Sequence, residues 1–418
     1  MTARPRSDRP YDVVVFGATG FTGKLVSEYL AEHRPRGLSW AIAGRSRDKL
    51  ERTRQDLAAL DPTLAQLPIL IADSQDRPAL NALAEQTRVV CTTAGPYSRY
   101  GRELVAACAE HGTDYCDLTG EPTFIRDTID RCEASAKASG ARIVPSCGFD
   151  SLPSDLGVHL LHEHFAARGS RLAEAKLYVI AMKGGPSGGT LATMLSIFED
   201  AQRDPQVRRL LADPYALNPD RSRDRGPDGR DQVGVAWDSD ESCWTGPFVM
   251  ASVNTRVVRR SNALRNFAYG RDFRYAEVTR FPKGPLGLLK ATGLSVGMVG
   301  GMTLASVEAL RPIIQSRMPA PGEGPTKSQR ENGFFKIVIV GRSAADKSGL
   351  SERASVRIDG RRDPGYGETA RMISEAALCL ALDPIERHGG ILTPAVAMGT
   401  TLVERLRKIG MRWEVGPA

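Results

Sequence analysis

A glycine-rich turn between a strand and a helix is the feature that most restricts how this chain can fold. The apolar, β-branched run Val13–Phe16 leads directly into Gly17-Ala-Thr-Gly-Phe-Thr-Gly23. Apolar residues then recur at helical spacing over residues 25–30. In this strand–turn–helix context, the GxxGxxG spacing is a variant of the dinucleotide-binding fingerprint. The N-terminus therefore predicts a βαβ unit that binds a nicotinamide dinucleotide.

Each glycine of this turn has its own expected role. Gly17 permits the tight turn, Gly20 lets backbone N–H groups approach the pyrophosphate, and Gly23 permits close packing of helix on sheet. The pyrophosphate then lies at the N-terminal end of the helix, where N–H groups point outward. The alternative is a glycine turn that binds no ligand. The residues expected to contact the cofactor here are Gly17, Thr19, Gly20, Phe21, Thr22 and Gly23.

The end of the second predicted strand distinguishes between the two nicotinamide cofactors. An NAD enzyme usually places an acid there, about 20 residues past the motif, for the ribose hydroxyls. This chain instead has Arg45 and Ser46, with Lys49 one turn further on. A cation and a hydroxyl suit a 2′-phosphate, and no carboxylate is present to repel it. We therefore predict NADPH; the alternative is that Arg45 is an ordinary solvated residue.

Two further strand ends are expected to border the nucleotide, because ligands of such sheets bind beyond the carboxyl ends of the strands. Asp73 follows residues 69–71, and it is expected either to contact adenine or to be the N-cap of the next helix. The loop after the fourth strand is expected to pass beside the nicotinamide ribose. It consists of Thr92, Thr93, Ala94, Gly95 and Pro96.

The first third of the chain alternates between short apolar strands and helices. The predicted strands are residues 12–16, 39–43, 68–71, 88–92, 113–117 and 142–145. The predicted helices include residues 24–31, 47–60, 77–86 and 103–111. This alternation implies right-handed crossovers and a doubly wound parallel sheet, so the fold class is α/β of Rossmann type. Residues 1–153 are expected to form this NADP-binding domain.

The alternation stops after Asp150, and the remaining sequence has an α+β character. A helix over 154–165, strands over 175–181, 248–258, 334–340 and 354–359, and a surface loop over 213–231 are predicted. We expect residues 154–365 to form a second, α+β domain for substrate binding or dimerisation. Helices over 369–381 and 394–408 are expected to pack the end of the chain, residues 366–418, back on the first domain.

One hydrophobic segment, residues 291–307, carries no charge over its whole length, and Gly293, Gly297 and Gly301 line one helix face. Small residues at this spacing allow another helix to approach closely. Three interpretations stay open: a buried or dimer-forming helix, a helix facing a membrane surface or an acyl chain, and a membrane span at the lower limit of length.

Composition limits the remaining possibilities. A chain of 418 residues is too long for one core, so two or three domains are expected. The net charge of +7 is diffuse and lacks a basic stretch with interleaved aromatics, which argues against nucleic-acid binding and suits anionic small molecules or an anionic membrane surface. Seven cysteines without a CxxC pair predict reduced thiols and no zinc site. With no apolar secretion signal visible, a cytoplasmic protein is expected, with membrane association left open.

Several motifs together carry a family resemblance that covers nearly the whole chain. They are FGATGFTGKL, AGRS, TTAGPYSRYG, GTDYCDLTGE (112–121), CGFDSLPSDLG (147–157), SGGTLATML (187–195), NTRVVRRSNAL (254–264), YGRDFRY (269–275) and LTPAVAMG (392–399). With these motifs the chain resembles the saccharopine dehydrogenase-like oxidoreductases. Within that group it is most similar to the trans-acting enoyl reductases of actinobacterial polyketide lipid synthesis, which serve the phthiocerol dimycocerosate and phenolic glycolipid pathways.

The resemblance implies NADPH-dependent reduction of the α,β double bond of an enoyl thioester. The substrate would be carried on the acyl carrier domain of a polyketide synthase that lacks its own reductase module. Two other functions stay open: a reductase of an imine or ketone, and a sensor that binds NADPH without turnover. Residues 221–245 are expected to differ between paralogues that act on different lipids.

No sequence motif identifies the residues that perform the chemistry. No Ser/His/Asp order or metal-ligand spacing stands out, and the HLLHEH run (159–164) is predicted to be a solvated helix face. Tyr97, beside the predicted nicotinamide site, is the first candidate proton donor and Tyr100 the second; Tyr97 packing against the nicotinamide ring is the alternative. A phenol with a pKa near ~10 needs its anion stabilised to act as an acid at neutral pH. Arg99 and Arg102 are the expected sources of that stabilisation.

Three further positions have open roles. Asp117 and Glu121 follow the fifth strand, and they are expected either to orient the substrate or to cap the next helix. Residues 187–190 are a further expected source of backbone N–H groups for a thioester carbonyl.

Overall fold

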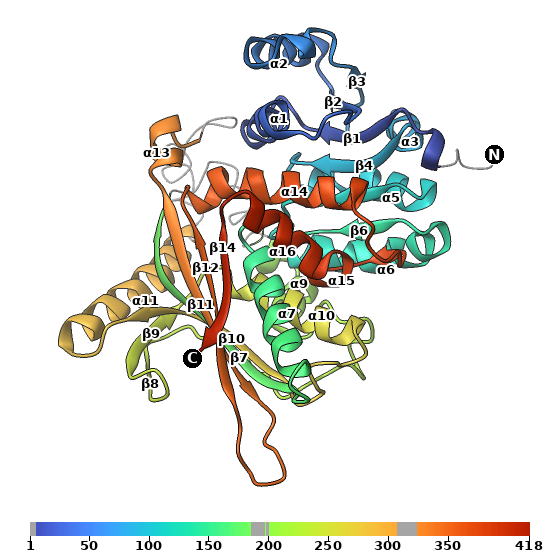
Figure 1. Cartoon of the computed structure of the whole chain (residues 1–418). Coiled ribbons are helices and arrows are strands. Elements are labelled where there is room, and N and C mark those ends of the chain that lie inside the picture. Colours follow the sequence, from blue (N-terminus) through green and yellow to red (C-terminus); the bar gives the residue numbers. More distant parts are fainter. Residues whose placement is uncertain (1–5, 185–196, 198–199, 307–323) are drawn as a thin grey trace. The chain divides into compact units, whose positions relative to one another are not determined.

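The computed structural model describes residues 6–184, 197, 200–306 and 324–418. The chain divides into two compact units. The first comprises Met1–Leu152 and Gly365–Ile409, with a short piece at Gly322–Gly324. The second comprises Pro153–Pro321, Pro325–Pro364 and Gly410–Ala418. Each unit contains a sheet of its own (Figure 1).

The sheet of the first unit has seven parallel strands in the order β13-β6-β5-β4-β1-β2-β3. The strands are β1 (Tyr11–Phe16), β2 (Trp40–Gly44), β3 (Ile69–Ile71), β4 (Thr87–Thr92), β5 (Asp114–Cys116), β6 (Arg142–Val144) and β13 (Gly390–Ile391). The predicted Rossmann-type sheet is confirmed, and all six predicted strands agree with the observed ones to within one residue at either end. The short edge strand β13, contributed by the C-terminal part of the chain, was not predicted.

Helices cover both faces of this sheet, as a doubly wound fold requires. Helices α1, α2, α14 and α16 form one group, in which α14 lies against α1 and over β1, β4 and β5; α3, α5 and α6 form the other. Their bounds are α1 (Phe21–His33), α2 (Arg47–Leu60), α3 (Arg77–Glu85), α4 (Tyr97–Tyr100), α5 (Arg102–His111), α6 (Pro122–Ser139), α14 (Thr369–Leu382), α15 (Pro394–Ala397) and α16 (Gly399–Lys408).

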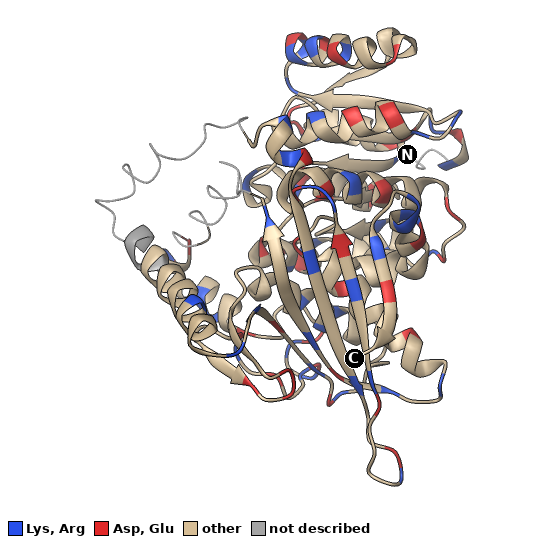
Figure 2. Ribbon diagram, turned by 60° about the vertical axis from the view of Figure 1, so that its left-hand side comes forward, with Lys and Arg blue, Asp and Glu red and all other residues tan. Residues whose placement is uncertain are grey.

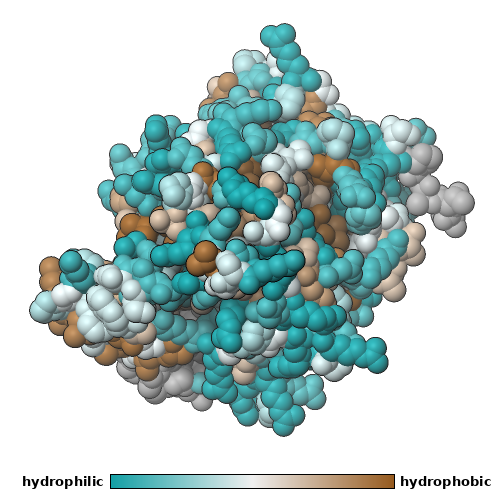
Figure 3. Space-filling model, turned by 60° about the horizontal axis from the view of Figure 1, so that its bottom comes forward, coloured by the Kyte–Doolittle hydropathy of each residue, from teal (hydrophilic) through white to brown (hydrophobic). Residues whose placement is uncertain are grey.

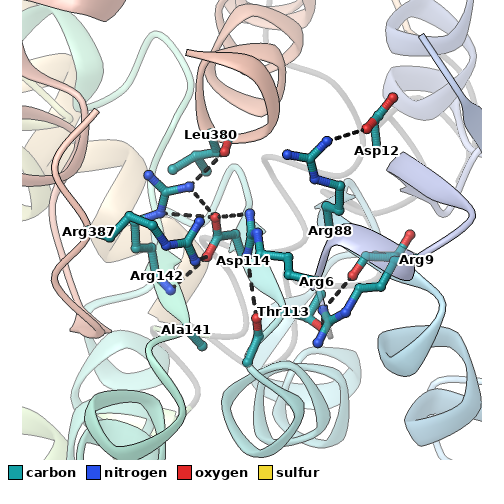
Figure 4. Close-up of polar contacts among 12 residues, drawn as sticks. Arg6, Arg9, Asp12, Arg88, Thr113, Asp114, Ala141, Arg142, Leu380 and Arg387 are labelled. Carbon is teal, nitrogen blue, oxygen red and sulfur yellow. Dashed lines mark hydrogen bonds and ion pairs between the residues drawn. The ribbon is translucent and has the colours of Figure 1, made fainter. Parts of the chain in front are cut away.

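Basic residues of the first unit gather around one buried carboxylate at the amino end of β5 (Figure 4). Asp114 is fully buried and accepts hydrogen bonds from the backbone N (3.0 Å) and Nε (2.9 Å) of Arg142. Arg6 forms an ion pair with the same carboxylate, and Arg387 lies 3.7 Å from it. A buried charge persists only when it is paired and hydrogen-bonded. These arginines therefore stabilise the sheet at the edge opposite the one where ligands bind.

The second unit contains a mixed sheet in the order β14-β12-β11-β7-β10-β9-β8, in which β7 and β10 are parallel and the other pairs antiparallel. Its strands are β7 (Leu172–Lys183), β8 (Ala236–Asp238), β9 (Cys243–Pro247), β10 (Arg274–Phe281), β11 (Phe334–Ser343), β12 (Arg353–Gly360) and β14 (Arg412–Pro417). Its helices are α7 (Leu152–Ala166), α9 (Pro205–Ala212), α10 (Ala251–Leu264), α11 (Pro285–Ser306) and α13 (Lys327–Glu331). Gly157 allows α7 to approach β11 closely, because a Cβ there would lie 2.4 Å from Ile339 Cδ1.

The strand predicted over residues 248–258 is wrong, because this segment forms helix α10. Its β-branched residues favoured a strand, but Arg256, Arg259 and Arg260 recur at the i, i+3, i+4 spacing of one helix face. All three side chains are buried. They hold the end of α9 and the loop after it by donating to the backbone oxygens of Leu211, Pro214 and Leu217. Residues 213–231 contain no helix or strand, as predicted, but Tyr215–Asn218 within them are buried.

Helices α14 and α16 belong to the first unit, but the residues after them, which were expected there too, belong to the second. After α16, Gly410 adopts φ +88°, and the last residues form strand β14, which pairs with β12 in the second unit. The reason is the alternation of Arg412-Trp-Glu-Val415, which has the period of a strand. Trp413 is buried, whereas Arg412 and Glu414 are exposed.

Two histidines of the HLLHEH run and all seven cysteines are packed inside the protein. The prediction of a solvated face for the HLLHEH run is wrong for His159 and His162, which are largely buried and lie against α10 and the turn after it, at Arg265 and Tyr269. Burial lowers the pKa of His159 to about 4. All seven cysteines are free and buried, which confirms the prediction of reduced thiols. Among the described residues, no group of three or more His, Cys, Asp or Glu is arranged to hold a metal ion.

Glu277 of β10 has a buried carboxyl group that contacts helix α10 in the second unit. The carboxyl group accepts hydrogen bonds from Tyr275 Oη (2.8 Å) and Asn254 Nδ2 (2.9 Å). Burial raises the pKa of Glu277 from 4.5 to about 7, although these hydrogen bonds oppose the shift. The folded protein therefore binds this proton more tightly than the unfolded chain does.

Stability should consequently fall as the pH rises from about 4.5 through about 7. At 1.36 kcal/mol per pKa unit, this group alone accounts for a loss of about 3 kcal/mol of unfolding free energy by pH 8. The variant Glu277→Gln, which resembles the protonated acid, should not show this loss. Urea unfolding at pH 5 and pH 8 can be followed by fluorescence, because Trp237, Trp244 and Trp413 lie in the second unit. Exposed Glu174→Gln is the control, and an equal pH dependence in wild type and Glu277→Gln would contradict the prediction.

Candidate cofactor-binding and active site

The glycine turn has the geometry expected of a nucleotide-binding loop. Gly17 adopts φ +83°, a conformation that L side chains rarely take, and its N–H donates to Ala43 O of β2 (2.9 Å). The turn closes through a hydrogen bond from Gly20 N to Gly17 O (3.0 Å). At Gly23 a Cβ would lie only 2.1 Å from Gly17 O and 2.9 Å from Ala18 Cα. Gly23 therefore permits the close approach of α1 to the turn that precedes it.

No described side chain caps the N-terminus of α1. Gly20 occupies the N-cap position, and no acidic residue lies in the first turn of the helix. Thr19, Phe21 and Thr22 are partly exposed around this end. The Phe21 ring packs edge-on against Tyr366 (5.1 Å between centroids), a neighbour that no sequence pattern indicated. An uncapped helix N-terminus without negative charge is a site that favours a pyrophosphate.

The end of β2 presents basic and hydroxyl groups that make no internal contacts. Arg45 and Lys49 are exposed, and neither side chain forms a hydrogen bond or ion pair with any described residue. Ser46 is the N-cap residue of α2, but its hydroxyl does not cap the helix. All three groups are thus available to bind a phosphate. This arrangement is compatible with the predicted 2′-phosphate contact.

Asp73, at the end of β3, closes a turn. Its Oδ1 accepts a hydrogen bond from Gln75 N (2.9 Å). The N-cap of α3 is Asp76, whose side chain accepts from Ala79 N, so the alternative role of Asp73 as N-cap is wrong. The contact of Asp73 with adenine stays a prediction.

The loop after β4 packs directly against the glycine turn. A Cβ on Gly17 would lie 3.1 Å from Ala94 Cβ, and Thr93 Oγ1 donates to Gly17 O (3.4 Å). Ala94 N in turn donates to Thr92 Oγ1 (3.3 Å). The two loops that sequence reasoning assigned to the cofactor are therefore neighbours at the carboxyl edge of β1 and β4, with Gly95 the most exposed part of the second loop.

Tyr97 lies inside the first unit, with its hydroxyl bonded on both sides. The hydroxyl donates to Thr92 O (3.2 Å) and accepts from Leu118 N (3.1 Å), and only 6% of the residue is exposed. Burial raises the pKa of Tyr97 well above its ordinary value. To act as a proton donor, Tyr97 would have to leave both hydrogen bonds.

Two carboxylates after β5 organise the loops around Tyr97. Glu121 accepts from Tyr97 N (2.8 Å) and Ser98 N (3.0 Å), so it caps the short helix α4 instead of the next helix, α6. Asp117 accepts from Thr119 N and Ser146 N, both at 2.9 Å. Burial raises the pKa of Asp117 to about 6, against these hydrogen bonds. In this structure both residues hold loop backbone in place.

Tyr100, the second candidate donor, is the more accessible tyrosine. It ends α4, is 40% exposed, and its hydroxyl has no hydrogen bond to any described residue. The adjacent Arg99 guanidinium also makes no contact within the described structure. Arg102, in contrast, is engaged by Asp127 at 3.0 Å. Of the two arginines expected to stabilise a phenolate, Arg99 is therefore the available one.

Asp150 is a candidate that the sequence reasoning missed. It lies in the loop after β6, at the same carboxyl edge as the cofactor loops, and it is half-buried. Its carboxyl group has no hydrogen-bond or ion-pair partner among the described residues, and burial raises its pKa to about 6. The only sequence signal was its place in the CGFDSLPSDLG motif, because Asp150 lies six residues after the end of β6. Residues 187–190, the expected thioester contacts, lie outside the described residues.

The comparisons with known proteins agree with this geometry. Residues 13–144 match the family described as the saccharopine dehydrogenase NADP binding domain. A Mycobacterium tuberculosis protein provisionally named a trans-acting enoyl reductase is 43% identical, with 98% of each chain covered. A trans-acting enoyl reductase of Mycobacterium bovis is 38% identical, with 97% of each chain covered. Among solved structures, saccharopine dehydrogenase (L-Glu forming) from Saccharomyces cerevisiae has a similar fold, with a TM-score of 0.51 at 14% identity over 97% of this chain and 99% of that one.

Proposed function

Because this chain belongs to the trans-acting enoyl reductase family of saccharopine dehydrogenase-like NAD(P)-dependent oxidoreductases, we propose that it uses NADPH to reduce the α,β double bond of an enoyl thioester. The thioester would be carried on the acyl carrier domain of a polyketide synthase during lipid synthesis. The observation that carries the proposal is the similarity to enoyl reductases over 97–98% of the chain, which includes the second unit as well as the cofactor loops. Residues 154–365 are the proposed substrate domain.

The residues of the first unit suit NADPH at each part of the nucleotide. Gly20 and Gly23 would hold the pyrophosphate at the N-terminus of α1, and Arg45 with Lys49 would bind the 2′-phosphate. The loop from Thr92 to Pro96 would position the nicotinamide ribose. The cofactor supplies the hydride for the β-carbon of the substrate, so the protein is left to orient the enoyl group and to provide a proton at the α-carbon.

For that proton we propose Tyr100 as the donor and Tyr97 as the residue that positions its helix. Tyr100 has a free hydroxyl, and the neighbouring Arg99 guanidinium can stabilise the phenolate that remains after transfer. Tyr97 ties α4 to β4 and to the loop after β5 through its two hydrogen bonds. Asp150 is a second candidate donor, because its carboxyl group is unpaired at the same edge of the sheet.

Three matched variants distinguish these roles. We expect Tyr100→Phe to lower kcat about 100-fold, the usual contribution of a positioned acid, with NADPH affinity unchanged. Tyr97→Phe should instead lower the melting temperature, because a donor to Thr92 O is lost and Leu118 N is left without its acceptor. If Asp150 is the donor, Asp150→Asn will cause the large loss, and wild-type kcat will fall as the pH rises through about 6. A full kcat in both Tyr100→Phe and Asp150→Asn would exclude both donors.

The substrate class is tested by NADPH oxidation, followed by absorbance, with two kinds of acceptor. One is an enoyl thioester on a purified carrier domain, and the other is an imine formed from an amino acid and a keto acid. Turnover of the enoyl thioester alone supports the proposal. Turnover of the imine alone would favour a saccharopine-type reductase, and tight NADPH binding without turnover of either would favour a sensor.

A further inference from the structure

Helix α11 presents a face of large apolar side chains to solvent. Leu286, Leu289 and Val296 are 61%, 68% and 66% exposed, and they lie on one side of the helix. Space-filling representation shows hydrophobic residues gathered along this helix (Figure 3). A helix that is apolar all round is typical of a protein core or a membrane. Contiguous exposed apolar surface marks a site of interaction.

The opposite side of α11 explains why the large side chains point outward. Small residues one turn apart, Gly287, Ala291 and Ser295, face the sheet, and α11 packs there on β9 and β10. A Cβ on Gly287 would lie 3.3 Å from Trp244 Cδ1 and only 1.7 Å from Pro282 O, so this turn admits no larger residue. The helix is thus attached to the sheet through its small residues. Its exposed leucines are therefore available to contact a partner outside the described residues.

The charge on α11 itself is positive only, whereas the acidic residues beside Trp237, namely Asp238, Asp240 and Glu241, are each paired with a basic residue. From residue 278 to residue 307 the sequence contains three basic residues and no acidic one. Arg280 pairs with Glu241 (3.7 Å). Lys283 and Lys290 are exposed and form no ion pair with any described residue. Along α11 the coloured ribbon accordingly shows basic and no acidic positions (Figure 2). This surface complements a negatively charged partner.

A pair of tryptophans adjoins the first turn of the helix. Trp237 of β8 is 47% exposed and packs edge-on against Trp244 of β9, with 5.1 Å between the ring centroids. Trp244 in turn lies beside Gly287 of α11. Indole rings favour the boundary between headgroups and acyl chains of a bilayer.

We propose that α11, together with Trp237, docks on the surface of a membrane that contains anionic lipid. The leucines and Val296 would enter the boundary of the acyl chains, while Lys283 and Lys290 would contact the headgroups. The helix would lie on the membrane and not cross it, because no helix among the described residues is long and apolar enough to span a bilayer. This inference concerns location and does not depend on the enoyl substrate.

A second copy of the chain is the main alternative occupant, since Gly293, Gly297 and Gly301 form a stripe suited to helix pairing. However, Lys290 continues this stripe by one turn. A symmetric pair brings the same patch of both copies together. Each copy would then bring its exposed lysines to a surface whose helix offers no acidic residue. Charge therefore favours an anionic bilayer over a second copy.

Vesicle flotation tests the proposal with the full-length protein. Vesicles of phosphatidylcholine mixed with phosphatidylglycerol are compared with vesicles of phosphatidylcholine alone. We expect binding to the mixed vesicles, and a loss of about tenfold or more in the double variant Leu289→Glu/Val296→Glu, because two apolar side chains no longer leave water. The control is Leu350→Glu, which introduces the same type of residue at a leucine that is 72% exposed in the loop between β11 and β12. This variant should bind the mixed vesicles like wild type.

A second pair of substitutions keeps the test valid if the first impairs folding. Lys283→Gln/Lys290→Gln should weaken binding to the mixed vesicles and make it insensitive to salt, with unchanged NADPH binding. The proposal is overturned if wild type floats with neither vesicle, or if both double variants bind as tightly as wild type. It is equally overturned if sedimentation finds a wild-type dimer that Leu289→Glu/Val296→Glu separates, without any vesicle binding.

Discussion

The variant Gly20→Ala should fold like the wild-type protein but lose NADPH affinity by a factor on the order of 1000. Gly20 has φ −77°, which alanine adopts readily, and a Cβ there would meet only Gly17 O, at 3.4 Å. The added methyl group would instead stand at the uncapped N-terminus of α1, where we propose that the pyrophosphate approaches the backbone. Losing two charge-assisted hydrogen bonds, at ~1.5–3 kcal/mol each, gives a loss of this size.

Gly23→Ala should also bind NADPH less tightly, but because the fold itself is disturbed. The difference in stability between the two variants distinguishes the roles of the two glycines. A Cβ at Gly23 would lie within 3 Å of three backbone atoms of Gly17 and Ala18, which cannot move aside as a side chain can. Overpacking of this kind costs about 1–3 kcal/mol, so both the melting temperature and NADPH affinity should fall. Affinity is measured by cofactor fluorescence titration and stability by thermal unfolding.

Gly44→Ala is the matched steric control, since its Cβ would make only ordinary contacts with Leu50 at 3.8–3.9 Å. Unchanged NADPH affinity in Gly20→Ala would mean that the cofactor does not approach this turn. A similar loss of melting temperature in Gly20→Ala and Gly23→Ala would mean that the two glycines share a purely structural role.

The first unit could be predicted closely because its signals are local. Each strand is a short apolar run that ends at a turn residue, and each crossover helix has a regular apolar period, so strand bounds were predicted to within one residue. Gly17 and Gly23 occupy positions where only glycine fits, and the GxxGxxG spacing alone indicates both positions. The two cofactor loops, far apart in sequence, then meet because parallel strands present their carboxyl ends at one edge.

The second unit was predicted less well because its elements depend on tertiary contacts. The segment of Arg256 to Arg260 has β-branched neighbours, and only the loop that these buried arginines hold reveals why it is helical. Strand β10 and the final strand β14 are defined by their partners in a mixed sheet, which no local pattern specifies. His159 and His162 were expected in solvent, because the position of α10 that covers them could not be derived from their own helix.

The positions of the two loops proposed to bind the cofactor could be predicted from the sequence, whereas the surroundings of the candidate proton donors could not. The glycines of the turn and the arginine at the strand end are recognised by residue type and spacing, so the sequence alone indicates where a cofactor would bind. A proton donor is defined by what its hydroxyl or carboxyl group contacts. Tyr97 and Tyr100 look alike in sequence, yet the hydroxyl of one is bonded on both sides and that of the other is free. Asp150 became a candidate only when the structure placed it unpaired at the edge of the sheet.

The largest change in cofactor preference should come from Arg45. Its exposed guanidinium makes no contact within the described chain, so its removal should leave the fold intact. If it binds the 2′-phosphate, Arg45→Ala should weaken NADPH binding by roughly 10–100-fold, the value of one charge-assisted hydrogen bond or ion pair at ~1.5–3 kcal/mol. NADH affinity should not change, because NADH lacks the 2′-phosphate.

Arg45→Asp should go further and reverse the preference. The carboxylate would repel the 2′-phosphate and accept hydrogen bonds from the ribose hydroxyls, as the acid of NAD enzymes does at this position. The ratio of the NADPH and NADH dissociation constants should then shift by a factor on the order of 1000 relative to wild type. Arg47→Ala, two residues along on the exposed first turn of α2, is the control and should leave the ratio unchanged. If Arg45→Ala and Arg47→Ala had equal and small effects, the NADPH preference would have to originate elsewhere in the chain.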